Sequence, residues 1–399
     1  MHRSDLIPFR VVSAPARVVA MFKHLILLML FLSWPAFAAA PPVQLAGTLT
    51  LMPYSNLDGG LLGWEYTYSE SGLENDVTGL IVLPAGAGPF PVAVLAHGKG
   101  GNAVGFGSVK SNEWFGPNGY MTISMDLTHA GEVFCMDQTN QCGGSPENIQ
   151  RAETAVFIAI SQNLIDQVGN VADRDNVFLY GNSIGATTAL ELAEKLGSRF
   201  RAVALSAGGI LLNSKLAYMT PSGSNGVANV VSPLLQMHGR LDGVIKPNEA
   251  EALVAALDQY DKVHQTVWFH SGGHNIATAQ NSTYQVGSFI LDWFDAYRMK
   301  TIPRITNLSP GRGKIGAAVR LMGSNLGTNP GNSSSVTFAG VKAAPTSWSP
   351  TSIVTKVPEG AITGSVQVTV PVGPVTDAQV EQPVGGGMRS NRVTFTVTP

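Results

Sequence analysis

Residues Asn176 to Gly197 read NVFLYGNSIGATTALELAEKLG, and this stretch decides the fold of the longer part of the chain. Its first half contains VFLY at 177–180, a β-branched and aromatic run that is typical of a buried strand. In its second half, apolar side chains recur at positions 189, 192, 193 and 196, which is helical spacing, and a glycine follows where a helix would end. The stretch therefore predicts a strand followed at once by a helix.

The five residues between that strand and that helix are GNSIG at 181–185. A G-x-S-x-G sequence in this setting is the pattern of a nucleophile elbow, a tight turn that presents a serine hydroxyl at the end of a sheet. The glycines are needed because Cβ atoms there would collide with the neighbouring strand and helix. The following helix start points free N–H groups at the place where an oxyanion would form. Ser183 is therefore the candidate nucleophile, and an ordinary glycine-rich turn is the alternative.

The composition indicates a well-packed α/β or β protein. Of the 399 residues, 44% are hydrophobic, 13% are charged and 44 are glycine, which differs from the composition of a disordered chain. The formal net charge is −2 and no long Lys/Arg run is present, which argues against nucleic acid as a partner. The length favours two domains.

The first 40 residues have the pattern of a signal peptide. An apolar run, HLILLMLFLSW at 24–34, follows Lys23, and AFA at 36–38 has the small-x-small form of a cleavage site near Ala38. The run is short for a bilayer span. We expect export to the periplasm, the cell surface or the medium, and either Met1 or Met21 is the true start.

The two cysteines lie in one loop, CMDQTNQC at 135–142. In an oxidising compartment an even count favours a disulfide between Cys135 and Cys142, and two free thiols are the alternative. A zinc site is not expected, because the spacing fits no zinc motif.

Strand-like and helix-like runs alternate along residues 41–300, which indicates a mainly parallel sheet flanked by helices. The strands are expected at 45–52, 62–68, 77–83, 91–96, 120–127, 177–180, 202–205, 234–237 and 263–269. The helices are expected near 108–115, at 147–168, after the elbow, at 248–260 and at 281–299, and residues 211–231 form an insertion that is a plausible rim or lid.

From Thr301 the pattern changes to short alternating runs between Gly, Pro, Ser and Thr turns, with no helical period. Strands are expected at 319–322, 336–338, 353–357, 366–370 and 393–397. We predict that residues 301–399 form a small antiparallel sandwich after a short linker at 300–304.

A serine nucleophile needs a base in contact with it and an acidic group behind that base. In elbow enzymes these follow in the order Ser, acid, His, each just past a strand. Asp242, in HGRLDG after the strand at 234–237, and His274, in HSGGHN after the strand at 263–269, fit that order. A turn aspartate is the alternative for Asp242. His264 and His270, in or at the end of the strand at 263–269, are the alternatives to His274 and are more simply structural. His97, His129 and His238 are spread too widely in the sequence to suggest a metal-ligand spacing, so no catalytic metal and no cofactor are expected.

The loop HGKGG at 97–101 follows PVAVLA at 91–96, which has the apolar character of a central strand. Such a loop can bring backbone N–H groups close to a substrate oxygen, and a simple turn is the alternative.

Together, residues 76–295 resemble the α/β-hydrolase superfamily, specifically its dienelactone-hydrolase-like and secreted esterase branch. The resemblance implies Ser183 as nucleophile, His274 as general base and acid, and Asp242 as the group that orients His274. It further implies an oxyanion hole made by the backbone N–H groups of Lys99 and Ile184. Dienelactone hydrolases use a cysteine nucleophile, so the serine here favours general carboxylic esters over the lactone.

Residues 303–399 resemble an IPT/TIG domain, an immunoglobulin-like sandwich, through PRITNLSPGRGKIGAAVRLMGSNLG, VTFAGVKAA and SIVTKVPEGAITGSVQVTV. The family implies a spacer, adhesion or ligand-contact role. Trp348 could contact a polymer, although packing is the more economical interpretation.

We therefore expect a secreted serine esterase that forms an acyl-enzyme on a small-molecule or polymeric ester. A polyester or lipid hydrolase held on an insoluble substrate by the C-terminal domain is the first alternative. A peptidase with the same triad is less favoured, because no propeller precedes the hydrolase region in this sequence. A non-catalytic surface-binding protein with a relict fold is the alternative from another class. Acyl chain length and oligomeric state do not follow from the sequence.

Overall fold

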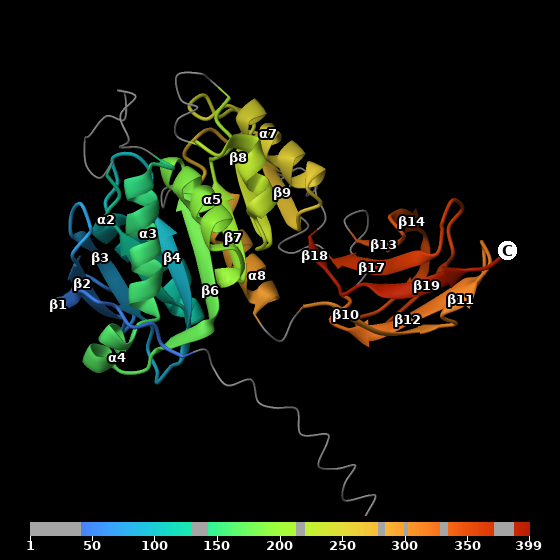
Figure 1. Ribbon diagram of the computed structural model, residues 1–399, viewed down its shortest axis with the longest axis horizontal. Helices are drawn as coiled ribbons and strands as arrows, with labels where there is room; N and C mark the ends of the chain where they lie inside the picture. The colour runs from blue at the N-terminus through green and yellow to red at the C-terminus, as the bar shows by residue number, and fades with distance from the viewer. Residues whose placement is uncertain are drawn as a thin grey trace, which may run out of the picture. The chain divides into compact units, whose positions relative to one another are not determined.

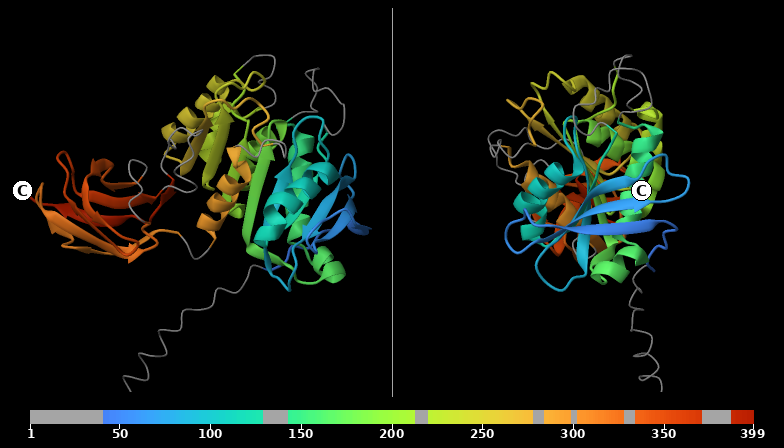
Figure 2. Two further views of the ribbon diagram at one scale, coloured as in Figure 1. Left: turned by 180° about the vertical axis from the view of Figure 1, so that it is seen from behind. Right: turned by 90° about the vertical axis from the view of Figure 1, so that its left-hand side faces the viewer.

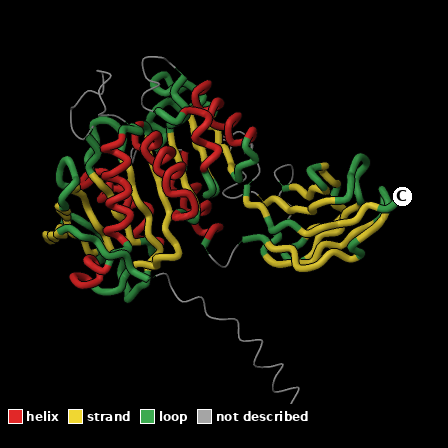
Figure 3. The backbone as a smooth tube through the Cα atoms, in the orientation of Figure 1, coloured by secondary structure: helices red, strands yellow, loops and turns green. Residues whose placement is uncertain are grey.

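The computed structural model describes residues 41–128, 143–212, 220–277, 284–298, 302–327, 334–370 and 387–399. Between 41 and 298 these residues form a sheet with helices on both faces, and from 302 onward they form strands, turns and loops without a helix (Figures 1 and 3). The predicted signal peptide at 1–40 and the predicted Cys135–Cys142 pair lie outside the described residues.

In the described part of residues 41–298, nine strands form one sheet, in the order β1-β2-β3-β5-β4-β6-β7-β8-β9. The pairings from β1 to β5 are antiparallel, and every pairing from β5 through β4 to β9 is parallel. The strands are β1 (Thr48–Tyr54), β2 (Leu62–Ser69), β3 (Val77–Leu83), β4 (Phe90–Ala96), β5 (Met121–Met125), β6 (Ala172–Asn182), β7 (Ala202–Ser206), β8 (Leu234–Gly239) and β9 (His264–Phe269).

Helices cover both faces of this sheet, so its central strands are buried on both sides. Side chains of α3 (Pro146–Ala159), α5 (Ile184–Leu196) and α7 (Pro247–Gln259) belong to the core on one face. The core on the other face contains side chains of α8 (Val286–Tyr297), and α2 (Ala103–Lys110) also lies there (Figure 2). Because β4 and β6 to β9 run parallel, their carboxyl ends meet at one edge, where the loops that carry the candidate residues begin.

Two helix predictions need correction. The helix expected at 147–168 is two helices, α3 and α4 (Gln162–Val168). It breaks because Val43 donates to the carbonyl oxygen of Ile160 and accepts from the N–H of Gln162, which takes these groups out of a helical ladder. The helix expected near 108–115 starts earlier: Asn102 caps α2 by accepting from the N–H of Gly105, and residues 111–115 continue it as a π-helical turn.

The insertion after β7 is described in its second part, which holds α6 (Gly223–Gly226) and a short 3₁₀ turn (Val227–Asn229). These pack against α5 and α7. Residues 213–219 of the predicted rim or lid lie outside the described part of the chain. No helix among the described residues is both long enough and apolar enough to cross a membrane.

The C-terminal region is a sandwich of two sheets with its own apolar core. One sheet has the order β10-β12-β16-β15, and the other has the order β11-β19-β17-β13-β14, with β18 beside β17. The strands are β10 (Arg304–Ser309), β11 (Arg312–Gly313), β12 (Ala318–Ser324), β13 (Ser335–Phe338), β14 (Val341–Ala343), β15 (Pro345–Trp348), β16 (Ser352–Lys356), β17 (Gly364–Val370), β18 (Met388–Arg389) and β19 (Val393–Val397). Within the described ranges of this region, the strands pair antiparallel except β11 with β19, which is a parallel pair.

The predicted fold class is confirmed: a mainly parallel α/β sheet flanked by helices is followed by an all-β sandwich. The half-buried ring of Trp348 packs against the sandwich core, and its indole N–H donates to the carbonyl oxygen of Leu326 at 2.8 Å. Packing therefore accounts for this tryptophan.

Candidate active site

Ser183 is the single residue between the end of β6 and the start of α5. Its φ of 55° and ψ of −120° are a rare combination for a residue with a side chain, and such strain costs about 1–3 kcal/mol. Its backbone N–H donates to the carbonyl oxygen of Ser206 on the neighbouring strand β7 at 2.9 Å. The sheet therefore supports the strained turn.

The two glycines of GNSIG lie where any side chain would collide with backbone. A Cβ at Gly185 would lie 2.2 Å from the carbonyl oxygen of Ala96 and 2.5 Å from that of His97. A Cβ at Gly181 would lie 2.2 Å from the carbonyl oxygen of Gly185. The close approach expected from the sequence is present, and it brings the end of β4 against the start of α5.

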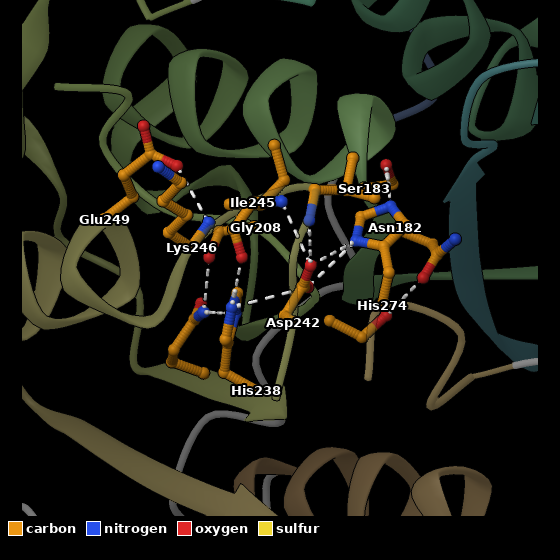
Figure 4. Close-up of polar contacts among 12 residues, drawn as sticks. Asn182, Ser183, Gly208, His238, Asp242, Ile245, Lys246, Glu249 and His274 are labelled. Atoms are coloured by element: carbon orange, nitrogen blue, oxygen red, sulfur yellow. Dashed lines mark hydrogen bonds and ion pairs between the residues drawn. The ribbon is translucent and has the colours of Figure 1, made fainter. Parts of the chain in front are cut away.

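His274 lies in the loop after β9, and its ring faces Ser183 (Figure 4). The Nε2 atom is 2.8 Å from the hydroxyl oxygen of Ser183. About a fifth of the side chain, 19%, is exposed, so the imidazole can exchange protons with solvent or substrate. This contact joins residues 91 positions apart in the sequence.

Asp242 lies just past β8 with its side chain buried. Its Oδ2 and Oδ1 are 2.8 Å and 3.1 Å from Nδ1 of His274, and Oδ1 also accepts from the N–H groups of Val244 at 2.8 Å and Ile245 at 3.0 Å. A carboxylate can only accept, so this network assigns the proton of the neutral imidazole to Nδ1. Nε2 is then left as an acceptor for the hydroxyl of Ser183.

The structure thus brings together Ser183, His274 and Asp242, the three residues that the sequence singled out. Among the other histidines, His264 is a buried residue of β9 whose Nε2 lies 2.9 Å from Oδ1 of Asp258. An oriented imidazole that accepts a serine hydroxyl proton is the arrangement that nucleophilic acyl transfer requires.

The glycine-rich loop after β4 lies directly against the elbow. A Cβ at Gly98 would be 3.2 Å from Cβ of Ser183 and 3.1 Å from the side-chain nitrogen Nδ2 of Asn182. His97 is fully buried, and its Nε2 accepts from the N–H of Leu127 at 3.1 Å. Its Nδ1 therefore carries the proton and donates to the carbonyl oxygen of Gly98 at 2.8 Å.

This hydrogen bond fixes the peptide plane that contains the N–H of Lys99. In a trans peptide the C=O and the N–H point in opposite directions, so holding the Gly98 carbonyl sets the direction of the Lys99 N–H. Burial lowers the pKa of His97, so the ring stays neutral and keeps this one arrangement. Ile184 begins α5, and its N–H belongs to the helical turn that has no intrahelical acceptor.

His238 lies behind Asp242, and sequence reasoning gave it no role in the site. It is fully buried, its Nε2 lies 2.9 Å from the carbonyl oxygen of Ile245 and 3.5 Å from Oδ2 of Asp242, and Figure 4 shows these contacts. Burial lowers its pKa, so a neutral ring ties β8 to the loop that carries Asp242. The sequence feature that could have indicated this role is the position of His238 four residues before Asp242. The sequence HGRLD alone, however, does not show on which side of the strand the histidine side chain lies.

A buried chain of hydroxyl groups supports the other side of the elbow. The hydroxyl of Tyr180 lies 2.8 Å from that of Ser206, which donates to the side-chain carbonyl of Asn182 at 2.9 Å. Burial raises the pKa of Tyr180, so its phenol stays neutral. The residue before Ser183 is therefore held from β7 as well as from its own strand.

Within the described residues, no group of three or more His, Cys, Asp or Glu side chains is arranged to hold a metal ion. A cavity of about 660 Å³ lies elsewhere, lined by residues of β1 to β3, α4 and the start of β4, including Trp64, Phe90 and Gln167. Ser183, Asp242 and His274 are not among the residues that line it.

Two family models match parts of this chain. The IPT/TIG domain matches residues 303–397, and the prolyl oligopeptidase family matches residues 209–301, which include Asp242 and His274. Together with the observed topology, these matches confirm the resemblance that the sequence motifs predicted, to an α/β-hydrolase followed by an IPT/TIG domain. They also support a hydrolase as the class of protein.

Among curated proteins, Esterase EstD of Thermotoga maritima is 28% identical over 140 residues, which is 33% of this chain and 32% of that protein. The match thus spans about a third of the relative's length. Among solved structures, a putative dienelactone hydrolase from Klebsiella pneumoniae has a TM-score of 0.49 at 15% identity and covers 59% of this chain and 99% of that one. An acetyl xylan esterase from Paenibacillus sp. R4 has a TM-score of 0.47 at 15% identity, with 63% and 89% covered.

Proposed function

We propose that this protein hydrolyses carboxylic esters through an acyl-enzyme on Ser183. The observation that carries the proposal is the unbroken line of contacts from the hydroxyl of Ser183 through both ring nitrogens of His274 to Asp242. A serine hydroxyl is a weak nucleophile unless a base of this kind takes its proton. The esterase that matches part of the chain supports an ester as the substrate class.

In the first step the Oγ of Ser183 forms a bond to the ester carbonyl carbon while its proton passes to Nε2 of His274. Asp242 stabilises the imidazolium through the Nδ1–H contact and stays ionised. The carbonyl oxygen becomes an oxyanion, for which the backbone N–H groups of Lys99 and Ile184 are the proposed donors.

The tetrahedral intermediate then breaks its bond to the alcohol oxygen, which takes the proton from Nε2 of His274. Water enters and attacks the acyl carbon, giving its proton to the same Nε2. The acid leaves when the bond to Oγ of Ser183 breaks and the proton returns to that oxygen. The ester and one water molecule are thus converted to an alcohol and an acid, and Ser183 and His274 return to their starting protonation states.

Replacing Ser183 by alanine tests the proposal. We expect Ser183→Ala to abolish hydrolysis of p-nitrophenyl acetate and labelling by a fluorophosphonate, while the protein stays folded. Ser198→Ala is the matched control, since Ser198 is exposed in a 3₁₀ turn after α5. Undiminished hydrolysis by Ser183→Ala would exclude the proposal, and absence of labelling in the wild type would favour the non-catalytic alternative.

A peptidase is the second candidate, because the prolyl oligopeptidase family model covers the segment with Asp242 and His274. The two candidates differ in the leaving group, an alcohol or an amine. Comparing kcat/KM for p-nitrophenyl acetate with that for an N-acyl-alanine p-nitroanilide separates them. We expect the ester to be preferred, and a preferred anilide would reassign the activity.

We further propose export with cleavage near Ala38, a Cys135–Cys142 disulfide, and a binding role for the C-terminal domain. The apolar run at 24–34 supports export, and the two cysteines in one loop of an exported protein support the disulfide. The IPT/TIG match supports the binding role. Mass spectrometry of the secreted protein would test the first two. Deleting residues 301–399 would test the third: loss of activity on a polyester film, with soluble-ester activity kept, supports a substrate-holding domain.

A further inference from the structure

Lys110, the last residue of α2, is a buried lysine that the proposed mechanism does not use. Its side chain is almost completely enclosed, at 3% exposure. The Nζ donates to the backbone carbonyl oxygen of Ala277 at 2.6 Å and lies 3.7 Å from the centre of the Trp114 ring. The ring of Phe106 is further away, at 5.7 Å.

Ala277 belongs to the loop that carries His274. It lies three residues after the histidine, within a turn described from 274 to 277, and the neighbouring Ile276 packs against Gly272 in the same loop. A charge-assisted hydrogen bond to the Ala277 carbonyl therefore fixes the far side of the turn that begins at His274.

The aromatic rings around Lys110 connect it to the elbow. Trp114 and Phe106 lie 5.9 Å and 6.0 Å from the ring of Tyr180, which precedes Ser183 by three residues on β6. Gly287 of α8 leaves room for Trp114, since a Cβ there would lie 2.7 Å from the ring. Lys110 thus contacts two aromatic rings, from α2 and the π-helical turn after it, and both rings pack against Tyr180 of β6, the strand that ends just before Ser183.

The other end of α2 begins immediately after the HGKGG loop, with Asn102 as its cap. One short helix therefore joins the loop beside Ser183 to the ammonium group that holds the histidine loop. We propose that Lys110 is a positioning residue, whose Nζ holds the Ala277 carbonyl and keeps His274 in reach of Ser183. This inference rests on the proposed function.

Enclosing the ammonium of Lys110 costs folding free energy, because the buried ion loses much of its hydration. Burial lowers the pKa of Lys110 to about 8, and the nearby Glu113 opposes that shift. Among the described residues, the phenol of Tyr180 also borders this cluster, since its ring lies 5.9 Å from that of Trp114, and burial raises its pKa so that it stays neutral. Residues 278–283, TAQNST, follow Ala277 and contain no ionisable side chain.

The sign of the pH effect follows from this lowered pKa. Below pH 8, roughly, the ammonium is present and holds the carbonyl; above it the amine is neutral and both the hydrogen bond and the cation–π contact weaken. We expect kcat to fall on the alkaline side as Lys110 loses its proton.

The experiment compares Lys110→Met and Lys110→Arg with Lys195→Met, the control at a half-exposed lysine on α5. We expect Lys110→Met to fold, to lose about 10- to 100-fold in kcat and to keep its KM. Lys110→Arg keeps a charge at all accessible pH values, so we expect it to retain most of kcat and to move the alkaline decline to higher pH. A wild-type kcat in Lys110→Met, or an alkaline decline unmoved in Lys110→Arg, overturns the proposal.

Amide hydrogen exchange of residues 271–277 separates this inference from the proposed function. Faster exchange there in Lys110→Met than in the wild type supports a positioning role, and equal exchange overturns it, whether or not the protein hydrolyses esters. Failure of the proposed function would show separately, as a wild type that is neither labelled at Ser183 nor active. If Lys110→Met does not fold, the pH profile of Lys110→Arg decides.

Discussion

The substitution Asp242→Asn tests whether Asp242 keeps the proton of His274 on Nδ1 and leaves Nε2 free to accept from Ser183. Oδ1 accepts from the N–H groups of Val244 and Ile245, so the asparagine must keep its oxygen at that position. Its NH₂ group then replaces Oδ2, which lies 2.8 Å from Nδ1 of His274. Two donors would face each other there unless the imidazole moves its proton to Nε2.

That tautomer presents an N–H to Ser183 where an acceptor is needed. The hydroxyl of Ser183 lies 2.8 Å from Nε2 and then has no base. Loss of the correct tautomer with the geometry kept lowers kcat on the order of 10⁴-fold, which is about 5 kcal/mol of transition-state stabilisation. The fold should survive, because the contacts to both backbone N–H groups are kept and only about 1–2 kcal/mol of stability is lost.

The assay is kcat and KM for p-nitrophenyl acetate together with a thermal melt. Asp258→Asn is the matched control, since Asp258 also pairs with a histidine, His264 at 2.9 Å, but away from the elbow. We expect the control to keep its kcat. A kcat for Asp242→Asn within about ten-fold of the wild type would refute the assignment of His274 as an oriented base.

Two further predictions concern the loop beside the elbow and the helix behind it. Gly98→Ala would place a Cβ 3.2 Å from that of Ser183; we expect the loop to shift and kcat to fall about ten-fold or more with little change in melting temperature, measured on the same ester. Burial raises the pKa of Glu194, beside Glu191 on α5, to about 8. The folded state thus keeps a proton that the unfolded chain releases, so stability declines as the pH rises from about 4.5 to 8, by about 3 kcal/mol at pH 7. We expect Glu194→Gln to remove this decline, and calorimetry that finds the same variant-minus-wild-type difference at about pH 5 and pH 8 would contradict it.

Most strands from β3 to β9 could be predicted because they are buried on both faces and read as continuous apolar runs. The strand expected at 77–83 has those bounds in β3 (Val77–Leu83). The start of α2 was not found, because Gly105 and Gly107 hide its helical pattern. Gly107 is needed there: a Cβ would lie 2.3 Å from the hydroxyl of Ser124 on β5.

The break between α3 and α4 illustrates what local patterns cannot contain. It depends on Val43, more than a hundred residues earlier, which bonds to backbone on both sides of Ser161. The buried position of Lys110 could not be predicted from the sequence for the same reason, because its hydrogen-bond partner Ala277 is 167 residues away. In the C-terminal region the unpredicted strands include β11 and β18, which have two residues each and no apolar alternation to detect.

Ser183 could be identified from the sequence as the candidate nucleophile, but the tertiary contacts that hold it could not. Its φ of 55° is a conformation that residues with a side chain rarely adopt, and such a conformation persists only where the surrounding structure holds it. The glycines at 181 and 185 mark this turn in the sequence, because a Cβ at Gly185 would collide with the Ala96 carbonyl and a Cβ at Gly181 with the Gly185 carbonyl. The contacts that hold Ser183 come from β7 through Ser206 and from the loop after β9 through His274, so they become visible only when the sheet is assembled. The glycine pattern therefore located the site. Of the two long-range contacts, the backbone bond to Ser206 supports the turn, and the side-chain contact to His274 is the one that the proposed chemistry uses.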